Sequence, residues 1–407
     1  MENKIIKGHY DVAVVGGAGH VGLPLSLVLA DRGYRTLIYD VDKQAVEKIR
    51  SGVMPFMENG GVSLLRKMLK KRKIGFAEAP QELRAVPKII ITIGTPIDEF
   101  LNPSLKEIQS CLDDLFPYLS KEQLLILRST VYPGVTEWVF KYLLKRGKRL
   151  KVSFCPERIV QGRAIEELQT LPQIVSGMTP EAAREAASLF LKIAPKIVRL
   201  QPIEAEFSKL FCNAYRYIHF AVANQFYMIA ESAGVSYCNI LNGLKKEYPR
   251  AQDIPTAGFT AGPCLFKDTA QLAAFFRNKF SLGHAAMLIN EGLPQYIVDS
   301  LRQKYDLSKK TVGILGMAFK ADIDDARASL AYKLRKLLAY QTQDVLITDP
   351  FIKNDPNILS FEEVVKKSDI LILCAPHQVY KKVRLGKKIV VDIWNFWDSK
   401  KDGLKRV

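Results

Sequence analysis

The feature that most constrains the fold is a glycine-rich turn between an apolar strand pattern and a helical pattern, within residues 12–40. Residues 12–15 form an apolar run typical of a buried strand. The sequence G-x-G-x-x-G follows at 17–22, then a helical spacing over 23–32 and a second strand pattern over 34–39. This order predicts a βαβ unit at the start of a doubly wound parallel sheet.

Each glycine of this fingerprint has an expected physical role. Gly17 is expected to form the tight turn, Gly19 to let the backbone approach a pyrophosphate, and Gly22 to let the helix pack closely on the strand. The helix N-terminus adds N–H groups and partial positive charge for the phosphates. Asp40, at the end of the second strand pattern, is placed to accept ribose hydroxyls and would repel a 2′-phosphate. The motif therefore predicts NAD binding, and NAD rather than NADP.

Strand and helix patterns along the 407 residues indicate more than one domain. They alternate through the first 200 residues, one long apolar helical stripe covers 203–233 before Gly234, and a further strand–helix series starts at 311. We expect an α/β protein with two Rossmann-like parallel-sheet domains joined by a long central helix and a helical region. The expected domain limits are 1–200, 201–303 and 304–407. The third region lacks a complete G-x-G-x-x-G, so a second dinucleotide is not expected there.

Polar residues follow several strand patterns in the first region. Strand patterns at 89–93, 124–127 and 152–154 precede Thr95-Pro96, Ser129-Thr130 and Glu157, and a fourth pattern lies at 174–175. Because ligands bind at the carboxyl ends of strands in open α/β sheets, these residues are expected to face the nicotinamide side of the site. The predicted cofactor-binding residues are Gly17, Gly19, His20, Val21, Gly22, Asp40, Thr95, Pro96 and Thr130.

Composition excludes several other classes of function. The formal net charge of +17 suggests anionic partners, but the basic residues are dispersed in short groups, so specific nucleic-acid binding is not expected. Six scattered cysteines without a C-x-x-C pair predict neither a zinc ribbon nor a disulfide framework, and no metal is expected. No run is long and apolar enough for membrane insertion. We expect a cytoplasmic protein.

A glycine-rich loop over 258–268 carries a cysteine, Cys264, close to Lys267 and Asp268. A lysine beside a thiol favours the reactive thiolate, and glycines give a substrate access to it. A packed loop cysteine without any chemical role is the alternative that these residues alone leave open.

Seven segments in order resemble the UDP-glucose/GDP-mannose dehydrogenase family over nearly the whole chain. They are residues 17–24, Gly94-Thr95-Pro96, 129–134, Cys155-Pro156-Glu157-Arg158, 209–214, the 258–268 loop, and Phe319-Lys320 with Asp324-Asp325-Ala326-Arg327.

The resemblance implies oxidation of the C6 alcohol of a nucleotide sugar to a carboxylate, with two NAD⁺ and one water. One NAD⁺ accepts only two of the four electrons, so an aldehyde-level intermediate must be held between the steps. By resemblance Cys264 is the nucleophile that holds it, first as a thiohemiacetal and then as a thioester that water cleaves.

The resemblance also assigns roles to other residues. Lys209 and Asn213 share one helix face and would stabilise a negative oxygen. Glu157 would act in thioester hydrolysis as a base or water-orienting group, while Thr130 and Asp268 would organise the water and the Lys/Asn group. The implied substrate-binding residues are Glu157, Arg158, Lys209, Asn213, Arg250, Gly258, Lys320 and Arg327.

The identity of the sugar depends on small details. Arg158 after Pro156-Glu157 is more similar to the UDP-N-acetylhexosamine branch than to the UDP-glucose branch, which has an aromatic residue there. Ala261 and Phe266 depart from the family's usual glycine and proline near Cys264. A homodimer or higher homo-oligomer is expected through the long helix. The alternatives are a two-electron hydroxyacid-type NAD dehydrogenase, which needs no cysteine, and a non-catalytic nucleotide-binding protein.

Overall fold

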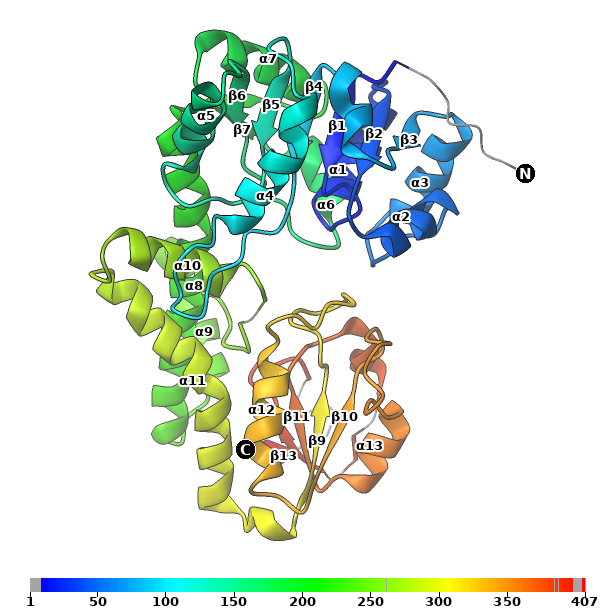
Figure 1. The fold of residues 1–407 in the computed structure, drawn as a ribbon. Coiled ribbons are helices and arrows are strands. Elements are labelled where there is room, and N and C mark those ends of the chain that lie inside the picture. Colours follow the sequence, from blue (N-terminus) through cyan, green and yellow to red (C-terminus); the bar gives the residue numbers. More distant parts are fainter. Residues whose placement is uncertain (1–8, 261, 384, 387, 398–404, 407) are drawn as a thin grey trace. The chain divides into compact units, whose positions relative to one another are not determined.

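The computed structural model describes residues 9–260, 262–383, 385–386, 388–397 and 405–406. The chain divides into two compact units, residues 1–212 and 213–407. Each is built on a parallel sheet, so the predicted α/β class with two parallel-sheet regions is confirmed (Figure 1). The three domain limits expected from the sequence remain a prediction.

The first unit contains a six-stranded parallel sheet in the order β3-β2-β1-β4-β5-β6. Its strands are β1 (Val12–Val15), β2 (Thr36–Tyr39), β3 (Ile74–Phe76), β4 (Lys88–Ile91), β5 (Leu124–Leu127) and β6 (Lys151–Phe154). Its helices are α1 (Gly22–Asp31), α2 (Lys43–Arg50), α3 (Gly61–Lys70), α4 (Lys106–Leu115), α5 (Val135–Lys145), α6 (Ala164–Thr170) and α7 (Pro180–Phe190).

All residues of β1 and β5 are buried, as is typical of a parallel sheet that helices cover on both faces. The strand order reverses between β1 and β4. Doubly wound sheets bind their ligands outside the carboxyl ends of the strands at such a switch point. The glycine turn after β1 lies at this position.

The strand expected at 174–175 forms, but it does not join the main sheet. This strand, β7 (Gln173–Val175), pairs with β8 (Ile197–Arg199) in a separate two-stranded sheet. The next residues account for the difference, because Ser176 and Met178 donate their N–H groups to carbonyls of β6. These bonds cover the edge of the six-stranded sheet, where β7 would otherwise have paired.

The second unit combines helices with a five-stranded parallel sheet in the order β10-β9-β11-β12-β13. Its strands are β9 (Thr311–Leu315), β10 (Asp344–Thr348), β11 (Ile370–Leu373), β12 (Ile389–Val391) and β13 (Lys405–Arg406). Its helices are α9 (Tyr237–Lys245), α10 (Leu265–Phe275), α11 (Ser281–Lys304), α12 (Leu330–Ala339) and α13 (Phe361–Lys367).

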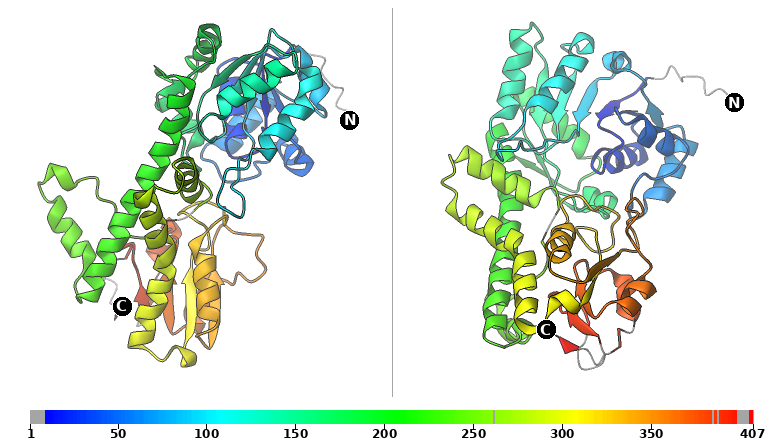
Figure 2. Two further views of the ribbon diagram at one scale, coloured as in Figure 1. Left: turned by 60° about the vertical axis from the view of Figure 1, so that its left-hand side comes forward. Right: turned by 60° about the horizontal axis from the view of Figure 1, so that its bottom comes forward.

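A large hydrophobic core joins the helices and the sheet of the second unit. It includes Ala223 of the long helix, Leu293 of α11 and Val312 of β9, so the helical region and the C-terminal sheet pack on shared apolar side chains. Figure 2 shows α11, in yellow, lying beside α12 and this sheet.

The predicted long helix is α8 (Pro202–Ser232), of 31 residues. It ends at Ser232, and Gly234, the expected cap, follows with a φ of 71° in the left-handed region. The N–H of Val235 donates to the carbonyl of Ala230 at 3.0 Å, which is the bond of a Schellman cap. Among the described residues, no helix combines the length and apolar character that crossing a membrane requires.

Candidate active site

The glycine turn after β1 begins at Gly16, one residue before the fingerprint. The residue with positive φ is Gly16, at 74°, rather than Gly17. Gly17 lies within the turn as predicted, because the N–H of Gly19 donates to the carbonyl of Gly16 at 3.3 Å. Gly17 is required for a different reason, since a Cβ there would lie 2.7 Å from the carbonyl oxygen of Val14.

The other two fingerprint glycines have opposite surroundings. A Cβ on Gly22 would lie 2.3 Å from the carbonyl oxygen of Gly16, so close packing of α1 on the turn requires glycine there. Gly19 is exposed, and the nearest atom to a Cβ there would be 3.5 Å away. Space beside the Gly19 backbone is what a bound pyrophosphate needs, so the turn fits a dinucleotide.

Asp40 lies directly after β2 and contacts the same turn. Its Oδ2 accepts a hydrogen bond from the N–H of Ala18 at 2.9 Å, and its Oδ1 accepts from the N–H of Asp42 at 3.0 Å. The side chain is half-buried. A carboxylate has about four acceptor positions, so both oxygens keep capacity for ribose hydroxyls.

The remaining predicted cofactor residues surround this turn and the neighbouring strand ends. Thr95 is buried after β4 and donates its hydroxyl to the carbonyl of Thr130, after β5, at 2.5 Å, while Pro96 is exposed. Val21 is the N-cap of α1. The His20 ring lies 4.0 Å from the ring of Phe56, and its Nδ1 is 3.1 Å from Nε2 of Gln161.

Glu157 follows β6 as predicted, but its carboxylate is buried rather than directed openly into a cleft. Oε1 accepts from the N–H groups of Arg158 and Ile159 at 2.7 and 3.0 Å, and Oε2 pairs with Arg128. These three interactions leave one acceptor position on Oε2. The guanidinium of Arg158 donates to the carbonyl of Pro172.

Arg128 is a residue of this site that sequence reasoning missed. It is fully buried at the end of β5 and, besides Glu157, donates to the carbonyl of Cys155 and to Oε1 of Gln173. Its guanidinium also lies 4.9 Å from the ring of Phe190. An arginine directly after four buried strand residues is the signal that could have found it, because a charge there needs a buried partner.

In the second unit, Cys264 is an exposed thiol at the N-cap of α10. The N–H of Asp268 closes the first helical turn on the carbonyl of Cys264 at 2.9 Å. A thiolate at a helix N-terminus is stabilised by the partial positive charge of the helix. Phe266 is half-buried in this helix, and Ala261 lies outside the described residues.

Asp268 connects the cysteine's helix to α8. Its Oδ2 accepts from Nδ2 of Asn213 at 2.5 Å, and its Oδ1 lies 3.5 Å from Nζ of Lys267. Asn213 and Asp268 are both buried. Lys209 is half-buried one helical turn before Asn213 on α8. The structure thus orients the Asn213 amide through a carboxylate at the start of α10.

The predicted substrate residues of the second unit differ in exposure. Arg250 and Arg327 are exposed, and Lys320 is half-buried. Gly258 packs beneath Trp394, whose ring atoms would lie 2.4 Å from a Cβ, and its N–H donates to Oδ1 of Asn224 at 2.9 Å. Glycine is required at 258 because a side chain has no space there.

These features define the class of protein. A doubly wound sheet with a dinucleotide turn, an acid after β2, and an exposed thiol beside an amide–carboxylate pair are the parts of an NAD-dependent oxidoreductase. Three models of one family match the chain: the NAD binding domain over residues 10–194, the central domain over 203–292, and the UDP binding domain over 313–399. The chain belongs to the UDP-glucose/GDP-mannose dehydrogenase family and is an NAD-dependent nucleotide-sugar dehydrogenase.

Individual relatives span the same length. An NDP-N-acetyl-D-galactosaminuronic acid dehydrogenase from Ralstonia solanacearum is 28% identical over 95% of this chain and 96% of its own. A UDP-N-acetyl-D-mannosamine dehydrogenase from Pyrococcus horikoshii is 28% identical over 94% of both chains. The solved structure of the UDP-D-ManNAc dehydrogenase from Pyrococcus horikoshii has a TM-score of 0.89 at 27% identity, covering 97% of this chain and 98% of that one. Family membership sets aside the hydroxyacid-type and non-catalytic alternatives.

Proposed function

We propose that this enzyme oxidises the C6 alcohol of a UDP-N-acetylhexosamine to the uronate through a covalent intermediate on Cys264. The observation that carries the proposal is the exposed Cys264 at the start of α10, one turn from the buried Asp268–Asn213 pair. The choice of sugar is supported by Arg158 and by the relatives, whose names specify N-acetylated hexosamine substrates or products.

The chemistry requires a nucleophile that releases its product. Bound NAD⁺ supplies the hydride acceptor, once for each two-electron step. In the first step the C6 alcohol loses a hydride and its hydroxyl proton and becomes the aldehyde. The Cys264 thiol adds to this aldehyde, forming a C–S bond, and loss of a second hydride and of the adduct's hydroxyl proton gives a thioester. Water then breaks the C–S bond, which releases the carboxylate and restores the thiol.

Asn213 and Lys209 stabilise the C6 oxygen when it carries negative charge. An amide N–H and an ammonium are the donors that such an oxygen needs. Asp268 accepts from Asn213, so it fixes which way the amide points. Lys267 lies beside the same carboxylate and balances part of its charge.

Glu157 and Thr130 act in the hydrolytic half of the reaction. The bonds from Arg128 and two backbone N–H groups hold the Glu157 carboxylate in one orientation and leave one acceptor position on Oε2. We assign Glu157 the role of orienting the attacking water. Thr130 follows β5 and assists with that water.

The nucleotide and the cofactor are bound by residues with matching charges. Gly19 and the N-terminus of α1 would hold the NAD pyrophosphate, and Asp40 would hold the adenosine ribose. Arg250, Lys320 and Arg327 supply cations for the UDP diphosphate, since a guanidinium forms a bidentate fork with phosphate. Gly258 and Arg158 complete the predicted substrate contacts.

The enzyme acts as a homodimer or higher oligomer in the cytoplasm. Tyr215, Val222, Phe226 and Ile229 are exposed apolar residues of α8, and their spacing of seven, four and three places them on one helix face. Such a face is expected to be covered by a second copy. A reducing compartment suits a mechanism that needs a free thiol.

Product stoichiometry tests the proposal. A panel of UDP and GDP sugars, followed by NADH absorbance, should give turnover with a UDP-N-acetylhexosamine and two NADH per sugar. Cys264→Ser should lower kcat by about 10³-fold or more with NAD affinity unchanged, because an alkoxide is a poorer leaving group than a thiolate. Cys212→Ser, which alters another exposed cysteine, is the matched control. One NADH per sugar together with normal activity of Cys264→Ser would contradict the proposal.

A further inference from the structure

The turns after β1 and β9, one in each parallel sheet, are built alike, but the aspartate that each turn contacts is buried to a different extent. After β1, Gly16 has positive φ and the N–H of Ala18 donates to Asp40. After β9, Gly316 has a φ of 88° and the N–H of Ala318 donates to Asp349, the residue directly after β10, at 2.9 Å. Asp40 is half-buried, whereas Asp349 is only 4% exposed.

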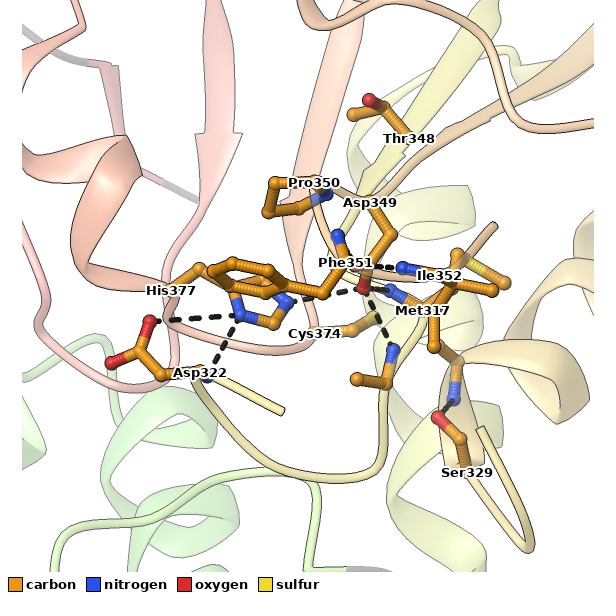
Figure 3. A network of polar contacts seen from close by, with 12 residues as sticks. Met317, Asp322, Ser329, Thr348, Asp349, Pro350, Phe351, Ile352, Cys374 and His377 are labelled. Atoms are coloured by element: carbon orange, nitrogen blue, oxygen red, sulfur yellow. Dashed lines mark hydrogen bonds and ion pairs between the residues drawn. The ribbon is translucent and has the colours of Figure 1, made fainter. Parts of the chain in front are cut away.

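Asp349 is enclosed by five hydrogen-bond donors (Figure 3). Its Oδ2 accepts from the N–H groups of Met317 and Ala318 and from Nε2 of His377 at 3.1 Å, and its Oδ1 accepts from Phe351 and Ile352. Burial works to raise the pKa of Asp349, but the bonds from His377 and the backbone outweigh it and hold the pKa below its usual value. The carboxylate is therefore a fixed structural anion that no ribose can reach.

His377 links Asp349 to Asp322. The ring is fully buried, and its Nδ1 accepts a hydrogen bond from the N–H of Asp322 at 2.9 Å. An accepting Nδ1 has no proton, so the ring proton is on Nε2, and this N–H donates a hydrogen bond to Asp349. Figure 3 shows the ring between the two aspartates.

Asp322 lies where the backbone is strained. Its φ is 57°, a left-handed value that costs a non-glycine residue free energy. Two bonds hold it there, because its N–H donates to His377 and its Oδ1 accepts from the N–H of Gln378 at 2.9 Å. Ala328, with a φ of 53°, is a second left-handed residue six positions later. Residues 322–328 thus form a loop with an unfavourable left-handed residue at each end.

This loop leads directly to the cysteine. The carbonyl of Ala328 accepts the N–H of Gly262, two residues before Cys264, at 3.4 Å. Arg327 is held by Asp325 at 2.6 Å. The Asp325 carboxylate and, more weakly, Cys264 raise the pKa of Arg327.

We propose that His377 is a positioning residue that, through Asp322, holds loop 322–328 in the conformation that brings Arg327 and Ala328 to the backbone of the Cys264 loop. The role of Cys264 in this inference rests on the proposed function, whereas the geometry of loop 322–328 does not. It predicts that loss of the Nδ1 acceptor alters nucleotide binding and the reactivity of the thiol, although His377 touches neither.

The test uses the full-length enzyme and two measurements that need no turnover. UDP affinity is measured by titration calorimetry, and alkylation of Cys264 by iodoacetamide is followed by mass spectrometry of its peptide. His377→Gln keeps a donor for Asp349 but removes the Nδ1 acceptor. We expect UDP affinity and the alkylation rate to fall by about tenfold or more, with NAD affinity unchanged.

Rescue separates positioning from a merely structural role. Glycine adopts positive φ readily, so the double variant His377→Gln/Asp322→Gly should regain UDP affinity to within about threefold of the wild type. Leu338→Ala, a change in the same unit's core remote from this loop, controls for general loss of stability. Unchanged UDP affinity in His377→Gln, absence of rescue, or an equal loss in Leu338→Ala would each overturn the inference.

Two variants of the exposed residue Asp322 test the inference in the case in which His377→Gln does not fold. The Asp322 side chain is 42% exposed, so its variants should fold. Asp322→Ala adds strain at positive φ and should weaken UDP binding, whereas Asp322→Gly should weaken it much less. Equal affinities in the two variants would overturn the inference. Failure of the proposed function would appear separately, as a wrong NADH count in the wild-type enzyme.

Discussion

Glu157 and Arg128 show how a residue predicted for catalysis is also committed to stability. Glu157→Gln leaves the fully buried Arg128 without its charge partner. Breaking a buried ion pair from one side costs about 3–5 kcal/mol, so we expect the free energy of unfolding to fall by about 3 kcal/mol. Urea denaturation followed by circular dichroism measures it. Arg128→Met combined with Glu157→Gln should recover part of the loss, and an unchanged unfolding midpoint in Glu157→Gln would contradict the pair's importance.

The same variant separates the two halves of the reaction. If Glu157 orients the hydrolytic water, Glu157→Gln should still release about two NADH per active site in a burst, followed by very slow turnover. Intact mass should then show the sugar nucleotide linked to Cys264 at the acid oxidation level. The measurement belongs at a temperature where circular dichroism shows the variant folded. A folded, NAD-binding variant without burst or adduct would assign Glu157 a structural role alone.

Asp40 is predicted to determine which dinucleotide binds, and its hydrogen bond to Ala18 gives the prediction a control. Asp40→Ala should weaken NAD binding and reduce discrimination against NADP, because both the acceptor and its charge are lost. Asp40→Asn keeps an acceptor for the Ala18 N–H but removes the charge. Fluorescence titrations with both cofactors should show relaxed discrimination in both variants and weaker NAD binding mainly in Asp40→Ala. A wild-type preference for NADP would refute the assignment.

At the scale of elements, two glycines of the turn between β1 and α1 have different predicted roles. Gly22 is needed for packing of α1 on the turn, and Gly19 is needed for binding of NAD. Gly22→Ala places a Cβ 2.3 Å from a backbone oxygen that cannot move independently. Overpacking of this kind costs about 1–3 kcal/mol, so the melting temperature should fall even without NAD. Gly19→Ala has space for its methyl group and should melt normally, but it should weaken NAD binding by about tenfold.

Differential scanning calorimetry, with and without NAD, compares the two variants. The expected pattern is a lower melting temperature for Gly22→Ala alone and a smaller NAD-induced shift for Gly19→Ala. Identical behaviour of the two would show that the turn is not organised as described.

At the scale of the whole molecule, the exposed apolar face of α8 predicts self-association. Phe226 is 44% exposed at the middle of this face. Phe226→Asp would bury a charge in the interface between copies, so we expect the mass measured by light scattering to fall to that of one chain. Tyr340→Asp alters a side chain that is 91% exposed elsewhere and should leave the mass unchanged. A monomeric wild-type enzyme would refute the oligomer.

Local periodicity and residue order were enough to predict the architecture and the cofactor. The strand and helix patterns, the long helix and its cap at Gly234 follow from contacts within a few residues, which a sequence contains directly. The fingerprint and Asp40 predicted NAD because the residues of one βαβ unit are close in sequence. Seven motifs in order were sufficient to identify the family.

Tertiary structure alone decided which polar side chains meet. Arg128 and Glu157 are 29 residues apart, and Asp349 and His377 are 28 apart, so each pair forms only after parallel strands align their carboxyl ends. Likewise, β7 joins β8 because the segment after it already covers the edge of β6. No local pattern specifies such partners. These partners meet because buried charges and strand edges need hydrogen bonds. That need arises only once the core has closed and water is excluded.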